Sequence, residues 1–302
     1  MIFKKTIIRN IVTAGVILLA FFMVDRLMGA GLNQLCLNSQ IRFSRLYGGD
    51  LKPDVVILGN SRGVNACYVP DIKASTSLNP INLSYNGMSM KIAGMLFADY
   101  LEKNRKPALL ILEITNLNAD DDLIHNLKQY VDVSPRLGGL LYEKDPFNYH
   151  VAKWIKTYKY NSEFFLRTLY FYTRSDQSWI NRYTMDRDAA LNFSPDAAQQ
   201  ANFETIDGDE LSALKSILTL AGENDIAVRL LISPYLPNLI DHIEGYGAWK
   251  GKILQAVGDE YPLWDYASTV RELDYFADPV HLNLAGSKAL LEKMIVDGFY
   301  DF

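Results

Sequence analysis

Two short stretches of the chain carry residues whose types and spacing suit nucleophilic catalysis by serine. The first is 59–62 (GNSR), which places Ser61 two residues after a glycine, and the second is 278–281 (DPVH), which places Asp278 three residues before His281. A carboxylate at that spacing can hold the imidazole of the same turn and stabilise the imidazolium that forms when the ring takes a proton from serine. The two stretches together predict a Ser61–His281–Asp278 triad for acyl transfer.

Each stretch also has a plainer interpretation. Ser61 alone could be an ordinary loop serine, and 278–281 alone could be a loop that caps the following helix. Nothing comparable surrounds the chain's three other histidines, His125, His150 and His242. The pairing of the two stretches therefore favours the catalytic interpretation.

The strand that must position Ser61 is an apolar, β-branched run at 54–58, which predicts a strand buried on both faces. Ser61 would then lie beyond the carboxyl end of that strand, where open α/β sheets keep their ligand crevice. Further strands are predicted at 80–85, 108–114, 227–232 and, more weakly, 262–265. Helices are predicted between and after them, at 64–74, 90–103, 211–221, 248–257 and 285–296. This alternation predicts a three-layer α/β/α sandwich with a mostly parallel sheet.

Two helix starts carry recognisable capping residues. Ser89 precedes the helix at 90–103 and suits an N-cap, and 207–210 (DGDE) has the spacing of a capping box before the helix at 211–221.

The segment at about 118–205 breaks the alternation, because it contains no clear strand pattern. We expect a helical insertion at the carboxyl edge of the sheet. Its aromatic residues are dense, and we expect most of them to form a small core of its own and a minority to line a sugar or lipid groove: Tyr142, Phe147, Tyr149, Trp154, Tyr158, Tyr160, Phe164, Phe165, Tyr170, Phe171, Tyr172, Trp179 and Tyr183.

The sequence pattern at the amino terminus predicts a membrane-spanning segment. Basic residues (Lys4, Lys5 and Arg9) precede an apolar run at 11–24 that has no polar face. The basic residues orient that end toward the cytoplasm. A cleavable signal peptide is the rival interpretation, but 28–30 (MGA) is a poor cleavage site. We expect an uncleaved single-pass anchor in residues 1–30 at the inner (cytoplasmic) membrane, with a domain at 31–302 outside the cytoplasm, in the periplasm.

Composition narrows the function classes further. The 302-residue chain has a net charge of −5 and no Lys/Arg-rich block, which argues against a nucleic-acid partner. No metal-ligand or nucleotide-binding motif is evident, and serine chemistry needs no cofactor. The two cysteines, Cys36 and Cys67, could form one disulfide or remain two thiols.

Taken together, the two stretches resemble the motif blocks of the SGNH (GDSL-like) hydrolase superfamily. Residues 59–62 match the first block with Asn60 in place of aspartate, and 278–281 match the last. The resemblance maps the oxyanion glycine of the second block onto Gly87. The third block, G-x-N-D, is replaced by 113–116 (EITN), in which Asn116 would supply an oxyanion amide.

Residues 59–63 also satisfy G-x-S-x-G, the nucleophile elbow of α/β-hydrolases. That fold needs several strands before its serine and an acid far ahead of its histidine. Only the membrane segment precedes the first strand here, so we interpret this match as accidental.

The amino-terminal anchor and the atypical third block resemble SGNH proteins of bacterial envelope polysaccharide modification, such as alginate and cellulose O-acetylation proteins or the D-alanine transfer protein of teichoic acid synthesis. The resemblance implies a serine-dependent acyltransferase that acts on an extracytoplasmic polysaccharide or acylated glycan, beside a membrane-bound O-acyltransferase. Two alternatives stay open: a carbohydrate esterase, and a non-catalytic scaffold of a polysaccharide export complex.

Overall fold

The computed structural model describes residues 2–115 and 117–302, and the chain divides into two compact units. Unit 1 comprises Met1–Gln40 and Ile124–Thr173, and unit 2 comprises Ile41–Leu123 and Arg174–Phe302. The segment at 118–205 is thus shared between the two units.

Unit 2 is built on a five-stranded parallel sheet, as the sequence pattern predicts. Its strands, in chain order, are β1 (Val55–Leu58), β2 (Pro80–Asn82), β3 (Leu109–Glu113), β4 (Ala227–Ile232) and β5 (Leu263–Asp265). Their spatial order is β2-β1-β3-β4-β5, and every neighbouring pair is parallel. All residues of β1 and β3 are buried, as expected for central strands covered on both faces. The predicted α/β fold class is confirmed.

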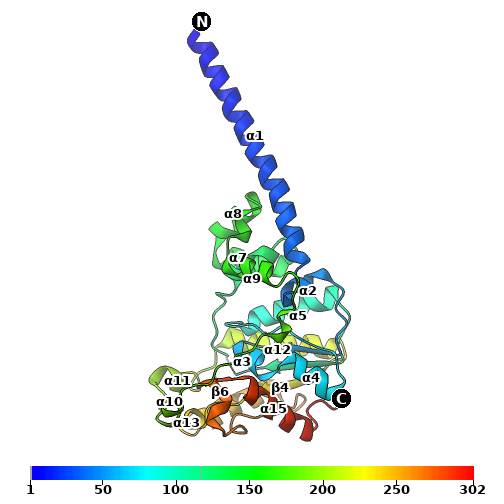
Figure 1. Ribbon diagram of the computed structural model, residues 1–302, viewed down its shortest axis with the longest axis vertical. Coiled ribbons are helices and arrows are strands. Elements are labelled where there is room, and N and C mark those ends of the chain that lie inside the picture. Colours follow the sequence, from blue (N-terminus) through cyan, green and yellow to red (C-terminus); the bar gives the residue numbers. More distant parts are fainter. Residues whose placement is uncertain (1, 116) are drawn as a thin grey trace. The chain divides into compact units, whose positions relative to one another are not determined.

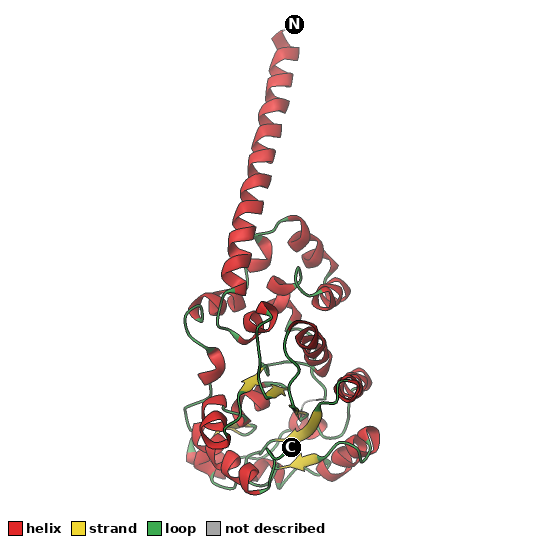
Figure 2. Ribbon diagram, turned by 90° about the vertical axis from the view of Figure 1, so that its right-hand side faces the viewer, coloured by secondary structure: helices red, strands yellow, loops and turns green. Residues whose placement is uncertain are grey.

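The connections place helices on both faces of this sheet. Because parallel crossovers are right-handed, the step from β1 back to β2 runs over one face and the later steps over the other. Helix α5 packs on α12, and α12 packs on α14, whereas α15 packs on α3 and α4. Figure 1 shows α5 and α12 on one side of the strands and α15 on the other, and Figure 2 shows the strands enclosed by helices. The α-helices of unit 2 are α2 (Arg42–Gly48), α3 (Ser61–Ala66), α4 (Val69–Thr76), α5 (Met90–Lys103), α10 (Arg187–Leu191), α11 (Ala197–Ala201), α12 (Gly208–Glu223), α13 (Pro237–Ile240), α14 (Tyr246–Val257) and α15 (Leu284–Val296).

Short elements complete this unit. The 3₁₀ turn η3 (Asp176–Ser178) lies beside β2, and a second one, η4 (Leu273–Tyr275), directly precedes a small antiparallel hairpin of β6 (Phe276–Asp278) and β7 (His281–Leu282). The sequence predicts a plain loop at this hairpin, because its strands are too short to give an alternating pattern.

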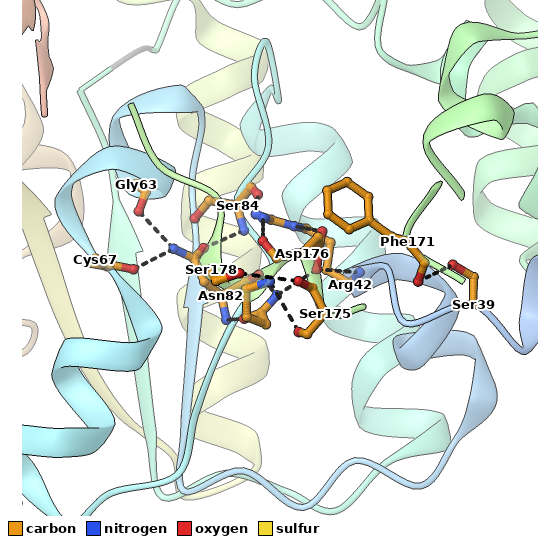
Figure 3. A network of polar contacts seen from close by, with 11 residues as sticks. Ser39, Arg42, Gly63, Cys67, Asn82, Ser84, Phe171, Ser175, Asp176 and Ser178 are labelled. Carbon is orange, nitrogen blue, oxygen red and sulfur yellow. Dashed lines mark hydrogen bonds and ion pairs between the residues drawn. The ribbon is translucent and has the colours of Figure 1, made fainter. Parts of the chain in front are cut away.

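The helix predicted at 64–74 is wrong in its bounds, since the structure has two helices there. Helix α3 already begins at Ser61, and the non-helical residues Cys67 and Tyr68 separate it from α4. Pro70 lies in the first turn of α4, where a missing N–H costs nothing, but its ring could not continue α3. The Asn82 side chain donates to the carbonyls of Gly63 and Cys67, both at 3.0 Å, and so satisfies the end of α3 (Figure 3).

Strand β2 lies at the sheet edge and is closed by side chains rather than by another strand. The Gln177 amide accepts from the backbone N–H of Asn82 at 2.7 Å and donates to its carbonyl at 3.1 Å. Arg42 bonds to Asp176 at 2.6 Å and to the carbonyl of Ser84 (Figure 3). This network blocks the free edge, which otherwise could pair with another chain. The strand also ends at Asn82 rather than at the predicted Tyr85.

The start of α12 differs from the predicted capping box. Asp207 does cap the helix, because its carboxylate accepts from the backbone N–H groups of Asp209 and Glu210. The Glu210 side chain, however, turns away and accepts from the backbone N–H groups of Met90 (2.8 Å) and Lys91 (3.4 Å) at the start of α5. The N-cap predicted for α5 is confirmed, since Ser89 Oγ accepts from Ile92.

Unit 1 consists of helices only, within its described residues. They are α1 (Ile2–Leu37), α6 (Ile124–Leu127), η1 (Lys128–Tyr130), α7 (Pro135–Lys144), α8 (Pro146–Trp154), η2 (Tyr158–Tyr160) and α9 (Glu163–Tyr170). The expectation that most of the aromatic residues at 142–183 are buried is wrong. Three are buried (Tyr160, Phe164 and Phe165), whereas seven are exposed (Tyr142, Phe147, Trp154, Tyr170, Tyr172, Trp179 and Tyr183). Short helices bury only one face, so a dense aromatic composition does not give a dense core.

Both cysteines are buried and lie outside any disulfide, Cys36 in unit 1 and Cys67 in unit 2. Burial raises the pKa of the Cys67 thiol to about 12, and the nearby Glu113 carboxylate adds to this. Cys67 therefore stays protonated at neutral pH and is a poor nucleophile.

The burial of Glu210 makes stability depend on pH, and its hydrogen bonds to Met90 and Lys91 offset only part of this effect. Burial raises the pKa of Glu210 to about 7. The folded state then holds a proton that the unfolded state releases near pH 4.5, so stability falls as pH rises through this window, by on the order of 3 kcal/mol. We expect Glu210→Gln, which keeps an acceptor but cannot ionise, to gain stability relative to wild type between pH 5 and pH 8 in urea unfolding. The exposed Glu223→Gln on the same helix is the control. A constant difference between Glu210→Gln and wild type across this range would contradict the assignment.

Candidate active site

The nucleophile candidate, Ser61, is the first residue of α3, directly after β1. Asn60 caps this helix, because its side-chain oxygen accepts from the backbone N–H of Arg62 at 2.7 Å. Gly59 turns the chain with a φ of +154°, and a Cβ there would lie 2.7 Å from the Cβ of Glu113. Only glycine fits this approach to the neighbouring strand. The backbone N–H of Ser61 is in the first turn, where helix amides have no intrahelical acceptor.

The base and the acid lie together on the β6–β7 hairpin. One oxygen of Asp278 accepts from the backbone N–H groups of Val280 (2.9 Å) and His281 (3.0 Å), which fixes the turn. The same carboxylate contacts His281 Nδ1, at 2.8 Å from Oδ2 and 3.0 Å from Oδ1. Asn283 then caps α15 through the backbone N–H of Gly286. The D-x-x-H spacing thus lets Asp278 orient the His281 ring, and the start of α15 follows directly after this turn.

The structure brings these two stretches together. His281 Nε2 lies 2.7 Å from Ser61 Oγ, although the residues are 220 positions apart. Because an ionised carboxylate only accepts, Nδ1 carries the ring proton and Nε2 is left to accept from the serine hydroxyl. Ser61, His281 and Asp278 therefore have the connected geometry that serine activation requires.

The ionisation of Asp278 suits this role. Burial raises the pKa of Asp278, but the hydrogen bond and charge of His281, together with the two backbone N–H groups, outweigh burial and hold it below its ordinary value. The carboxylate stays ionised at neutral pH and can stabilise an imidazolium.

A cavity of about 190 Å³ opens beside Ser61 and His281. Phe203, Tyr235 and Leu239 form its apolar side, and Gln199 and Asn202 add amide groups. Helix α11 and the residues after it supply part of this lining from within the segment that the sequence marks as an insertion. The aromatic side chain that contributes here, Phe203, is buried against Tyr235, with ring centroids 5.5 Å apart.

Behind the serine lies a buried ion pair that sequence reasoning missed. Arg62 Nε is 3.5 Å from Glu113 Oε1, and both side chains are almost fully buried. Glu113 Oε1 also accepts from the hydroxyls of Thr115 (2.6 Å) and Ser233 (2.9 Å). The pair thus joins the carboxyl ends of β1, β3 and β4.

Arg62 also holds the hairpin that carries His281. Its guanidinium donates to the carbonyl of Val280, the residue before His281, and to the carbonyls of Ser233 and Pro234. It also stacks on Tyr235, with Cζ 3.5 Å from the ring centroid. The sequence does contain a signal for this pair: Glu113 is a charged residue inside the apolar run at 108–114. Buried strands rarely contain charged residues, and a buried carboxylate needs a cationic or hydrogen-bonding partner.

The two predicted oxyanion residues have different outcomes. Gly87 lies in the turn between β2 and α5, with a φ of +70°, and it is exposed. Tyr85, two residues earlier, donates its N–H to the carbonyl of Gly59, so this turn follows the strand beside the nucleophile strand. Gly87 does not line the cavity at Ser61, and its oxyanion role stays a prediction. Asn116 lies outside the described residues.

No protein-family model matches the chain, and no curated protein sequence matches it. Several solved structures are similar to it at low sequence identity. A candidate acylhydrolase from Bacteroides fragilis is 16% identical, with a TM-score of 0.42, 86% of this chain covered and 94% of the other. A candidate G-D-S-L lipolytic protein from Desulfitobacterium hafniense is 12% identical (TM-score 0.39, 81% and 96%). A GDSL-like lipase from Bacteroides thetaiotaomicron is 15% identical (TM-score 0.36, 81% and 88%).

These names belong to the superfamily that the sequence motifs resemble, and none of the three mentions polysaccharide acetylation. At such identities and TM-scores, a proposal on function depends on the geometry of Ser61, His281 and Asp278.

Among residues 2–115 and 117–302, no cluster of three or more His, Cys, Asp or Glu side chains is arranged to hold a metal ion.

The Arg62–Glu113 pair generates a stability prediction. Arg62→Met leaves the Glu113 carboxylate buried without its cation, which should cost on the order of 3 kcal/mol in urea unfolding. Changing both partners, Arg62→Met with Glu113→Gln, should recover part of that loss. Arg271, whose ion pair with Asp241 is half-exposed, offers the matched control: Arg271→Met should cost below about 1 kcal/mol. Strict additivity of the Arg62 and Glu113 single variants would contradict the coupling.

Proposed function

We propose that this protein is a serine acyltransferase that acts on an extracytoplasmic polysaccharide and acylates its hydroxyl groups. The observation that carries the proposal is the contact of 2.7 Å between Ser61 Oγ and His281 Nε2, with Asp278 on the other ring nitrogen. A hydrogen-bonded chain of this kind activates a serine for attack on an ester.

The reaction divides into two steps. Ser61 Oγ attacks the acyl carbon of the donor while its proton passes to His281 Nε2, and the bond to the leaving oxygen breaks as His281 returns that proton to it. An acceptor hydroxyl then attacks the acyl-serine, with His281 again taking and returning the proton. Backbone amides, with Ser61 and Gly87 the proposed donors, would stabilise each oxyanion by on the order of 3 kcal/mol per donor.

The cavity favours a short acyl group such as acetyl. Its volume of about 190 Å³ is below the roughly 300–1,000 Å³ of pockets that enclose drug-sized ligands. Phe203 and Leu239 give the acyl chain an apolar wall, and the amides of Gln199 and Asn202 suit a sugar hydroxyl.

The amino-terminal helix supports the proposed location. Helix α1 has one stretch that is long and apolar enough to span a membrane, within Lys4–Leu37, a test that a signal sequence near the amino terminus also passes. Its later turns hold unit 1 together: Asp25 bonds to Lys156 and Thr157, and Asn33 bonds to Tyr160. Cleavage after Ala30 would remove the Asp25 contacts, which favours an uncleaved anchor at the inner membrane with the catalytic unit outside the cytoplasm. A membrane-bound O-acyltransferase as donor partner belongs to the same proposal.

An acyl-serine can also be attacked by water, so the acceptor decides between transferase and esterase. We expect the full-length protein to consume p-nitrophenyl acetate faster than p-nitrophenyl octanoate, because the cavity is small. With oligosaccharides added as acceptors, mass spectrometry should detect acetylated sugar. Ser61→Ala should lower turnover by at least about 10³-fold, because the triad acts as a unit.

Three outcomes bear on this proposal. Free acetate with no acetylated sugar would identify an esterase. Octanoate turnover equal to acetate would contradict the short-acyl assignment. Unchanged turnover in Ser61→Ala would end the enzymatic interpretation in favour of a scaffold.

A further inference from the structure

Helix α8 directs large apolar side chains into solvent. Phe147 and Trp154 are each 72% exposed, Val151 is half-buried, and Ile155 follows the helix at 36% exposure. Positions 147, 151 and 154 have the i, i+4, i+7 spacing of a single helical face. We call Phe147, Val151, Trp154 and Ile155 the α8 face. Single exposed apolar residues are ordinary, but two rings on one face of so short a helix form a contiguous apolar strip.

The end of α8 is fastened to α1 at a defined level. The Asp25 carboxylate accepts from the backbone N–H groups of Lys156 (2.8 Å) and Thr157 (3.0 Å) and from the Thr157 hydroxyl (2.8 Å). One turn later on α1, a Cβ at Gly29 would lie 2.4 Å from the Cβ of Lys156, so the two segments approach closely there. Figure 1 shows α8 beside α1, as the part of unit 1 nearest to the projecting amino-terminal half of α1.

Asp25 and Arg26 also interrupt the apolar surface of α1. The side chains from Ile7 to Val24 are all exposed and mostly apolar, with Arg9 near the start of this run as its one charged residue, and Asp25 and Arg26 are the next charged residues along the helix. At about 1.5 Å per residue, the run at 7–24 measures roughly 27 Å, close to the thickness of a bilayer's hydrocarbon core. The level of Asp25 on α1 is therefore the level of the membrane surface, if α1 spans the membrane.

We infer that the α8 face docks on the lipid surface around the anchor, with Phe147 and Trp154 in the headgroup region. This inference depends on the proposed membrane anchor. Tryptophan is enriched at this depth because it combines an apolar body with a polar N–H, and phenylalanine is common on the apolar face of interfacial helices. The exposed side chains of His150 and Lys153 border the face, and a lysine suits anionic lipid headgroups. Glu143 is the exposed acidic side chain nearest in sequence, while Asp145 is engaged as the N-cap of α8.

The test uses the full-length protein in liposomes of phosphatidylethanolamine and phosphatidylglycerol, without other proteins or glycans. A bimane fluorophore is attached at Phe147→Cys or at Trp154→Cys, and its quenching by lipids with a nitroxide near the headgroup is measured. Leu19→Cys, in the apolar run of α1, is measured with nitroxides on the lipid acyl chains, at the depth of the hydrocarbon core, and reports whether the anchor is inserted. Leu191→Cys, an exposed apolar site on α10 of unit 2 that is not part of the α8 face, is the matched control. Wild type, whose two cysteines are buried, supplies the labelling blank.

We expect the headgroup nitroxide to quench both α8 probes at least about twofold more than Leu191→Cys, as for an interfacial helix. Quenching at Leu19→Cys but only control-level quenching at the α8 probes would overturn the inference and leave the anchor intact. Loss of quenching at Leu19→Cys as well would overturn the anchor and the inference together. Shielding of the α8 probes in native membranes, without quenching in liposomes, would identify a protein or glycan as the occupant and would also overturn it.

Discussion

The buried Arg62–Glu113 pair is the interaction on which the arrangement of the site depends. Arg62 follows the nucleophile, and Glu113 ends the adjacent strand β3. Through Ser233 and Val280, Arg62 reaches the end of β4 and the hairpin of His281. A charge removed from water is costly unless its partner is fixed, so the pair ties these four segments to one geometry. Placing Ser61 and His281 within hydrogen-bond distance follows from that constraint.

The sheet and the site differ in how much of them could be predicted from the sequence. The strands are apolar runs that need burial on two faces, and such runs have few alternatives to a parallel sheet. Ser61, His281 and Asp278 could be proposed because the D-x-x-H spacing is local and its chemistry is specific. The Arg62 contacts could not, because they join residues up to 218 positions apart and leave no periodic signal.

The predicted capping box at 207–210 was wrong because a long-range contact of Glu210 replaced the local one. Glu210 has the spacing of a capping box but bonds instead to the start of α5, because burying a carboxylate there requires backbone donors. For a different reason, the aromatic residues of α8 and α9 do not fill a core: these helices are short, and several of their rings lie on exposed faces. Side-chain type could be read from the sequence, but which face each side chain meets could not.

The most direct test of the proposed serine chemistry is labelling with a fluorophosphonate probe, followed by peptide mass spectrometry. Such a probe reacts with a serine whose proton has a nearby base, so the wild-type protein should be labelled at Ser61. Labelling should be lost in His281→Ala and slowed in Asp278→Asn, which leaves the ring in place but favours the tautomer that carries its proton on Nε2. Circular dichroism on each variant would establish that it remains folded. An unlabelled wild type, or a folded His281→Ala protein labelled at the wild-type rate, would contradict an activated Ser61.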